Sequence, residues 1–350
     1  MSEATVHSST SSPKKRTKKV VLVFLFVLLN VGIIAYTALK EFGGEKPEFD
    51  FSHFRLEYLL YAVAAFLLTL LCKMVVYGTL LKKTTGAFHP RISFNTAVIG
   101  RYYDYITPLG AGGQPFQVWY LAKERISGGI AAMLPIIALI LDHLAFVAVG
   151  LAAVFLYPGS DLETVLHVGI YVGMAMYLFI PLVLVLFSVF PRPIRFLVEA
   201  VAGLIAKIRP KTDKKAISEK FIHSLEEYRE SMRIVRGSVG TLLITFLFSI
   251  LHYVLLVSLP YLSFRMLGVE AGYLEITTTT VFVYLSVAAI PTPGNAGASE
   301  GLFYSVLSDV SPGNTFLAMM IWRIFSYYLY LAAGGLYYLG RLFCRKKRKE

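Results

Sequence analysis

Apolar residues along this chain gather in long runs, several of them about 20 residues or more, separated by polar stretches. A helix needs about 20 apolar residues to cross the roughly 30 Å hydrocarbon core of a bilayer. The pattern therefore predicts an all-α integral membrane protein, a polytopic helical bundle with six crossing segments. The predicted spans are 20–39, 56–80, 130–157, 166–190, 238–262 and 314–340.

The first apolar run follows a basic tail, residues 1–19, which is also the layout of a secretory signal peptide. The run is too long for a signal peptide, and no small-residue cleavage site precedes Lys40. It therefore predicts a first span that is retained.

The formal net charge is +12, from 34 basic and 22 acidic residues. Most of the basic residues lie in blocks beside apolar runs, as orientation signals do, which favours a multi-pass protein of the cell membrane over a nucleic-acid binder. The distribution predicts that the tails 1–19 and 341–350 are both cytoplasmic. The loops 40–55 and 263–275 are expected outside.

Residues 191–236 form the only long cytoplasmic stretch between predicted spans. Apolar residues recur there at helical spacing on both sides of Pro210, with charged residues opposite. The pattern predicts two amphipathic helices. They could lie on the inner leaflet near anionic headgroups, or form a linker packed on the bundle, and the sequence favours neither.

Two stretches, 92–125 and 276–309, are too interrupted by polar residues, glycine and proline to be ordinary spans. Each is expected to leave and return on the same side of the membrane. They predict re-entrant helical hairpins that break near the midplane, where protein or a water-filled cavity satisfies the open backbone.

The two breaks share a motif. The sequence reads TPLGAGGQPF from Thr107 and TPGNAGASEG from Thr292, so Thr, Pro, Ala and Gly recur at the same offsets. Each motif occupies the same place in a unit of span, span, hairpin and span. The units are 20–157 and 166–340, the second carrying the insert 191–236, and three crossings in the first unit place the second upside down. The sequence thus predicts an inverted-topology repeat, an architecture common in transporters.

Each break is expected to end one helix and start another, leaving backbone amides unpaired and facing a cavity. A helix is predicted to restart near Gln114 and Pro115, and another near Ser299 as N-cap with Glu300 in its first turn. The positive ends of both half-helices would then suit a phosphate or other anion. The two motifs are expected to face each other, with Gly112 and Gly297 within about 20 Å. The alternative is a pair of kinks that only shape the bundle.

Ionisable residues inside membrane segments mark a pathway or an internal pair. Arg101 and Asp104 could pair on one helix face, and Asp142 and Arg323 could bridge the repeats. Aromatic residues near the first break, including Tyr105 and Trp119, are candidates for the cavity wall. The candidate binding residues for a headgroup and its phosphate are Arg101, Asp104, Thr107, Pro108, Gly110, Gly112, Gly113, Gln114, Asp142, Thr292, Pro293, Gly294, Asn295, Gly297, Ser299, Glu300 and Arg323, with His143 and His252 as polar companions.

The sequence gives little support to a serine hydrolase, a phosphate-binding P-loop or a metal site. Gly297 to Gly301 matches G-x-S-x-G, but the serine-hydrolase elbow requires a strand that the sequence does not predict. The glycine-rich run 110–113 lacks the lysine of a P-loop. Cys72 and Cys344 have no metal-ligand spacing around them. We expect no catalytic residue, no metal site and no cofactor.

The paired motifs ITPLGAGGQPFQVWYL and IPTPGNAGASEGLFYSVL, in this topological setting, resemble the lysylphosphatidylglycerol synthase transmembrane family, the flippase-like part of the bacterial multiple peptide resistance factor. The resemblance covers essentially the whole chain. It implies transfer of a charged or aminoacylated phospholipid between leaflets and a link to antibiotic resistance through cationic peptides. The soluble domain that takes an aminoacyl group from tRNA is absent before Glu350, so lysyltransferase activity is not expected of this chain alone.

Three functions remain in view. The first is a lipid flippase or related transporter for anionic or aminoacylated phosphatidylglycerol. The second is a membrane component of lysylphosphatidylglycerol synthesis, which would need a separate aminoacyl-lipid synthase because 191–236 is too short to hold a transferase fold. The third is a scaffold or lipid sensor that transports nothing.

Overall fold

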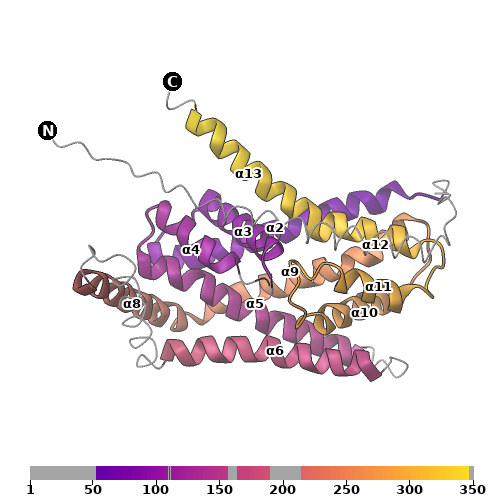
Figure 1. Ribbon diagram of the computed structural model, residues 1–350, viewed down its shortest axis with the longest axis horizontal. Coiled ribbons are helices and arrows are strands. Elements are labelled where there is room, and N and C mark those ends of the chain that lie inside the picture. Colours follow the sequence, from indigo (N-terminus) through magenta and orange to yellow (C-terminus); the bar gives the residue numbers. More distant parts are fainter. Residues whose placement is uncertain (1–52, 109, 111, 157–163, 190–213, 347–350) are drawn as a thin grey trace, which may run out of the picture.

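The computed structural model describes residues 53–108, 110, 112–156, 164–189 and 214–346. Within these residues the chain is helical and has no β-strand (Figure 1). The helices, in chain order, are α2 (Leu56–Thr85), α3 (Pro90–Ile106), α4 (Gly113–Lys123), α5 (Gly128–Leu156), α6 (Thr164–Val189), α8 (Lys214–Arg236), α9 (Val239–Met266), α10 (Tyr273–Ser286), α11 (Ala298–Leu307), α12 (Thr315–Arg323), the π-helix η1 (Ile324–Tyr328) and α13 (Leu329–Lys346).

Five helical stretches in the described residues are long and apolar enough to cross a membrane. They are Leu56–Thr85, Gly128–Leu156, His167–Leu186, Val239–Met266 and Thr315–Tyr337. The predicted first span, 20–39, lies outside the described residues. The chain is thus an all-α, multi-pass membrane protein, as the apolar runs predict.

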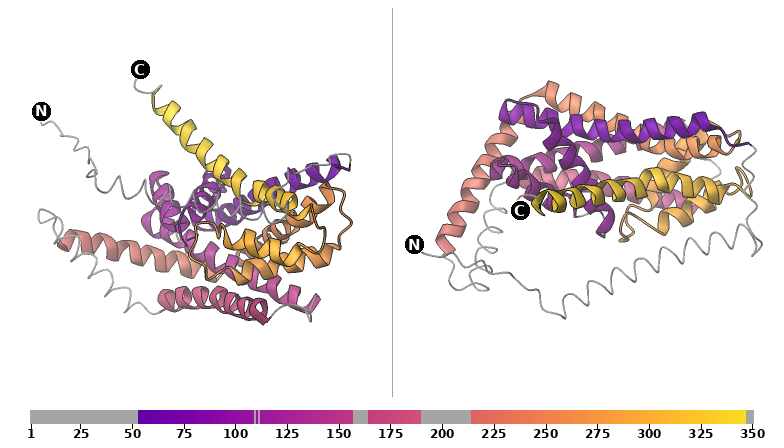
Figure 2. Two further views of the ribbon diagram at one scale, coloured as in Figure 1. Left: turned by 45° about the vertical axis from the view of Figure 1, so that its right-hand side comes forward. Right: turned by 90° about the horizontal axis from the view of Figure 1, so that it is seen from above.

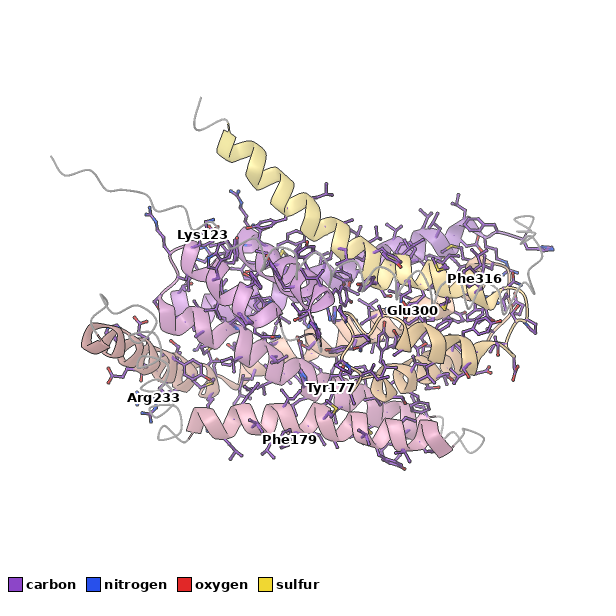
Figure 3. All side chains as sticks on the ribbon, in the orientation of Figure 1. Lys123, Tyr177, Phe179, Arg233, Glu300 and Phe316 are labelled. Atoms are coloured by element: carbon purple, nitrogen blue, oxygen red, sulfur yellow. The ribbon has the colours of Figure 1, made fainter. Side chains whose placement is uncertain are left out.

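Apolar side chains cover the outside of the bundle as well as its core. On α6, Phe179 points away from the other helices and is 63% exposed, whereas Tyr177 points toward α5 (Figure 3). The ring of Tyr177 contacts His143 and Phe146 of α5, with centroids 4.9 and 4.8 Å apart. Many other large apolar side chains are exposed on the helices, and an apolar surface of this extent is normally covered by lipid or another protein, which agrees with a membrane setting.

Both interrupted segments form a helix, a break and a second helix. The first consists of α3 and α4, separated at residues 107–112, and the second of α10 and α11, separated at 287–297. The predicted restart near Gln114 and Pro115 is confirmed, because α4 begins at Gly113 and places Pro115 in its first turn.

The last predicted span, 314–340, is not one regular helix. It is divided into α12, η1 and α13, and the π-helical turn was not predicted. Such a turn frees backbone carbonyls from the regular pattern. The carbonyl of Ser326, inside this turn, accepts a hydrogen bond of 2.7 Å from the hydroxyl of Tyr105 on α3, which supplies a physical reason for the irregularity.

The second half of the insert 191–236 forms α8, which projects at one end of the bundle (Figure 2). Near its C-terminus Tyr228, Met232 and Val235 are buried in a core formed with α2 and α5. Glu227 also accepts a 3.0 Å hydrogen bond from the amide of Gly129, where a Cβ would lie 2.2 Å from the Cβ of Glu227. This part of α8 is therefore a packed linker and not a free surface helix. The first predicted amphipathic helix, at 191–209, lies outside the described residues.

Candidate functional site

The two glycine- and proline-rich breaks meet. Pro108 and Pro293, which occupy equivalent places in the two motifs, form an isolated antiparallel β-bridge. The prediction that the motifs face each other is confirmed by this contact, although they lie far apart in sequence. Segments from both halves of the chain therefore border the same space.

The first break is closed by side chains of its own hairpin. The hydroxyl of Thr107 donates to the carbonyl of Tyr103 at 2.6 Å and accepts from the amide of Gly112 at 2.9 Å. A carboxylate oxygen of Asp104 accepts from the amide of Gly113 at 2.9 Å. A Cβ on Gly113 would lie 2.3 Å from that oxygen, so only glycine permits this close approach.

At the second break, helix α11 starts at Ala298 with Gly297 as its N-cap, at a backbone φ of 89° that favours glycine. Glu300 lies in the first turn, as predicted, and its carboxylate accepts from the amide of Gly297 at 2.7 Å. Ser299 is not the N-cap. Ser299 is the second residue of α11, and its hydroxyl donates to the carbonyl of Asn295 at 2.6 Å.

At three positions these contacts correct the expectation that the half-helices present unpaired amides to a cavity. The amides of Gly112, Gly113 and Gly297 are all hydrogen-bonded to side chains of their own hairpins. At these positions the positive ends of the helices are already neutralised by Asp104 and Glu300. These three amides are therefore not free for an anionic ligand.

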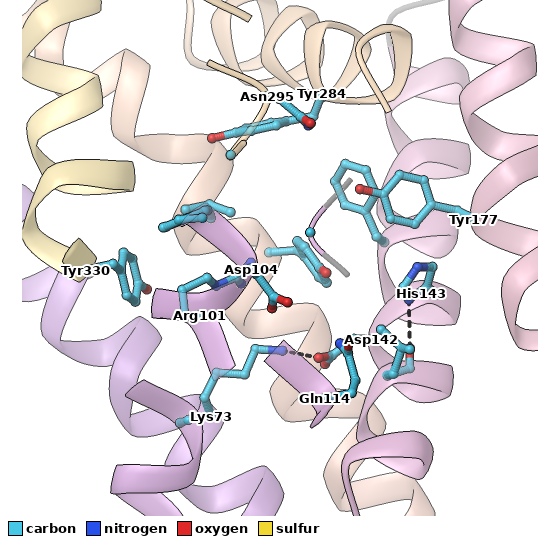
Figure 4. Close-up of a pocket in the computed structure, with 18 of the residues that line it drawn as sticks. Lys73, Arg101, Asp104, Gln114, Asp142, His143, Tyr177, Tyr284, Asn295 and Tyr330 are labelled. Atoms are coloured by element: carbon cyan, nitrogen blue, oxygen red, sulfur yellow. Dashed lines mark hydrogen bonds and ion pairs between the residues drawn. The ribbon is translucent and has the colours of Figure 1, made fainter. Parts of the chain in front are cut away.

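A cavity of about 510 Å³ lies beside the joined breaks and is bordered by both halves of the chain (Figure 4). Its wall is largely apolar and aromatic. The charged lining residues are Lys73, Arg101, Asp104, Asp142 and Arg323. The tyrosines are Tyr77, Tyr105, Tyr177, Tyr253, Tyr284 and Tyr330.

The charged residues Lys73 and Asp142 lie midway along the helices that cross the membrane. Asp142 is the central residue of α5, and His252 and Tyr253 are the central pair of α9. The helices α2 and α9 run antiparallel, since the amide of Arg55 donates to the carbonyl of Met266 at 2.9 Å. Lys73, near the middle of α2, therefore comes to the same level.

Lys73 and Asp142 form a buried ion pair between α2 and α5, with Nζ and Oδ2 2.5 Å apart. The other carboxylate oxygen of Asp142 accepts a 2.5 Å hydrogen bond from Ser249 on α9. One acid thus joins three crossing helices. The alternative of a bridge between Asp142 and Arg323 is wrong.

Glu300 and Arg323 form the second buried pair, with a carboxylate oxygen 2.6 Å from the guanidinium. The hydroxyl of Ser299 also contacts that guanidinium and lies 3.2 Å from the carboxylate oxygen. The residues Glu300 and Arg323 are 4% and 3% exposed, and the pair ties α11 to α12 in the interior (Figure 3).

Arg101 makes no ion pair within 4.0 Å in the described part of the chain, which excludes the suggested contact with Asp104. Its guanidinium donates to Nε2 of His252 at 2.7 Å. Because arginine cannot accept a hydrogen bond, Nε2 is unprotonated and the proton lies on Nδ1, 3.2 Å from the carbonyl of Thr69.

Two tyrosines complete the surroundings of Arg101. The hydroxyls of Thr69 and Tyr330 are 2.5 Å apart, and the guanidinium of Arg101 also lies over the rings of Tyr105 and Tyr330.

The candidate site residues fall into two groups. Those that line the cavity are Arg101, Asp104, Gly110, Gln114, Asp142, Gly294, Asn295 and Arg323. Those that shape or close the breaks are Thr107, Pro108, Gly112, Gly113, Pro293, Gly297, Ser299 and Glu300. Thr292 belongs to the second motif, where its amide donates to the carbonyl of Ile290 at 2.8 Å.

Sequence reasoning did not select Lys73 as a site residue, although a lysine inside an apolar run was a usable signal. Most of the lining tyrosines were also missed. Of the aromatic candidates near the first break, Tyr105 lines the cavity, whereas Trp119 is 49% exposed on α4.

Residues 20–334 match the model of a protein family described as "Lysylphosphatidylglycerol synthase TM region". The chain belongs to this family. A UPF0104 membrane protein of Archaeoglobus fulgidus is 24% identical over 315 residues, which cover 87% of this chain and 93% of the relative. No solved structure matches the chain significantly. The family membership agrees with the resemblance of the paired motifs and with a membrane-embedded protein.

Proposed function

We propose that this protein is a lipid flippase or a related transporter, which moves a charged phospholipid between the leaflets of the cell membrane. The observation that carries this proposal is the contact between Pro108 and Pro293 beside a charged cavity. Two broken hairpins that meet at a polar cavity are typical of secondary transporters.

The charges support the same function. Ionisable groups in the middle of membrane helices are costly, and where they line a cavity they usually belong to a substrate pathway. The cavity has both charged and aromatic walls, which suits a headgroup that leaves water while its acyl chains stay among apolar side chains. A scaffold needs no such cavity.

The topology that we propose has six crossings, two re-entrant hairpins in an inverted repeat, and both termini in the cytoplasm. Alternating access would then arise from movement of one repeat against the other around the joined breaks. Family membership suggests phosphatidylglycerol or its aminoacylated form as the lipid. A separate aminoacyl-lipid synthase would be the natural supplier of that lipid.

The test is a leaflet-exposure assay in proteoliposomes. Purified protein is reconstituted with trace amounts of headgroup-labelled phosphatidylglycerol or lysyl-phosphatidylglycerol, and a membrane-impermeant reagent reports the fraction in the outer leaflet over time. We expect the accessible fraction to rise above that of protein-free vesicles. Equal rates with and without folded protein would contradict transport and favour a scaffold or sensor.

A further inference from the structure

The six charged residues around the cavity do not play equal parts. Lys73 is paired with Asp142, and Arg323 with Glu300. Arg101 and Asp104 have no oppositely charged side chain within 4.0 Å in the described part of the chain. One positive and one negative group therefore remain for a ligand, and the set as a whole is neutral.

These two residues are placed to act together. They are three positions apart on α3, so their side chains lie on the same helix face. Both line the cavity, and Figure 4 shows the carboxylate of Asp104 pointing into it beside Arg101. Their protein partners are uncharged: Arg101 donates to neutral His252, and Asp104 accepts one backbone amide.

We infer that Arg101 and Asp104 form a dipolar site for a headgroup that carries an anionic phosphate and a protonated amine at once, with Arg101 on the phosphate and Asp104 on the amine. The inference deepens the proposed lipid transport and rests on it for the lipid source of the headgroup. Phosphate recognition falls to Arg101 because Lys73 and Arg323, the other two basic residues that line the cavity, already have carboxylate partners.

Selectivity follows from the cost of burying an unpaired charge. A headgroup with phosphate alone would leave Asp104 uncompensated, and one with an amine alone would leave Arg101 uncompensated. A ligand that carries both charges neutralises both residues and leaves the cavity neutral. The site should therefore discriminate against single-charge lipids of either sign.

The test measures binding and not transport. The full-length protein is placed in nanodiscs of a neutral, phosphate-free glycolipid, and binding is measured by native mass spectrometry for three probes. These are phosphatidylethanolamine, N-acetyl-phosphatidylethanolamine, which lacks the positive charge, and a dialkyl primary amine without phosphate. For the wild-type protein we expect phosphatidylethanolamine to bind about tenfold or more tightly than either other probe.

Two variants assign the roles. Asp104→Asn keeps an acceptor for Gly113 and should bring the preference for phosphatidylethanolamine over its N-acetyl form to about one, while the preference over the phosphate-free amine remains. Arg101→Gln should do the reverse, and Arg101→Lys should retain much of the wild-type pattern. Arg91→Gln, at the exposed start of α3, and Glu275→Gln, at the exposed start of α10, are matched controls that should keep both preferences.

Unchanged preferences in a folded Asp104→Asn protein, or no preference in the wild type, would overturn the dipolar site. Binding of soluble glycerophosphoethanolamine is measured as well. If it binds with the same dependence on both residues while the membrane lipid does not, the dipolar site is supported and the lipid-transport proposal fails. If the protein transfers lipid between leaflets but shows neither binding preference, the transport proposal is supported and the dipolar site is contradicted.

Discussion

The ammonium group of Lys73 lies 2.5 Å from Oδ2 of Asp142, at mid-length of two helices that are far apart in sequence. Ser249 holds the other oxygen of the same carboxylate. This arrangement joins α2, α5 and α9 at a common level in the wall of the cavity. It also leaves no charge on either residue free for a ligand.

Removing one partner of this pair should destabilise the protein more than removing both charges. We expect Lys73→Met or Asp142→Asn to lower the free energy of unfolding by about 3–5 kcal/mol, because the remaining charge is buried and unpaired. The double variant should recover much of that loss. Thermal midpoints in detergent measure the effect, with Lys82→Met, at the exposed end of α2, as the control. Strictly additive losses would argue against a coupled pair.

Gly113 should tolerate no side chain. In Gly113→Ala the new methyl group would lie 2.3 Å from a carboxylate oxygen of Asp104 and 2.7 Å from the carbonyl oxygen of Gly100, so the helix start must move and the cap must break. We expect loss of lipid transfer and a fall in stability of about 1–3 kcal/mol. Gly301→Ala is the control, since nothing lies within 4 Å of its Cβ and alanine is the better helix former. Equal behaviour of the two variants would contradict the described contact.

The contact between the breaks can be locked. Paired residues of an antiparallel bridge have Cα atoms about 4.5–5.5 Å apart, within the range that a disulfide spans. A Pro108→Cys, Pro293→Cys protein, with Cys72 and Cys344 replaced by alanine, should therefore cross-link on mild oxidation. If transport needs the breaks to separate, oxidation should stop leaflet transfer and reduction should restore it. Transfer at the full rate by the cross-linked protein would rule out such a movement.

Composition and periodicity predict a large part of this architecture. Proline and glycine predict both breaks, because each acts through its own backbone geometry and needs no partner. The partners of the charges could not be predicted in the same way. Whether Asp142 meets Lys73 or Arg323 depends on how α2 and α5 are rotated against each other, which a single sequence does not contain. The π-helical turn was missed for the same reason, since the tyrosine that stabilises it comes from α3.

The structure separates two acidic residues that the sequence treats alike. Glu300 is paired with Arg323 and buried, whereas Asp104 lines the cavity and has no basic side chain within 4.0 Å among the described residues. We expect Glu300→Gln to reduce both stability and transfer, with a loss of about 3–5 kcal/mol in the free energy of unfolding, because Arg323 loses its counter-charge. Asp104→Asn should stay within about 1 kcal/mol of the wild type, since the amide oxygen still accepts from Gly113, yet it should lose transfer of amine-bearing lipids.

Thermal midpoints and leaflet-exposure rates from the same protein preparations distinguish these outcomes. Ser299→Ala serves as an intermediate case, because it removes a hydrogen-bond partner of the Glu300–Arg323 pair without removing a charge. Its stability should fall between those of the wild type and Glu300→Gln. A stable Glu300→Gln protein that fails only in transfer would mean that Glu300 binds the substrate, and the division between paired and free charges around the cavity would have to be redrawn.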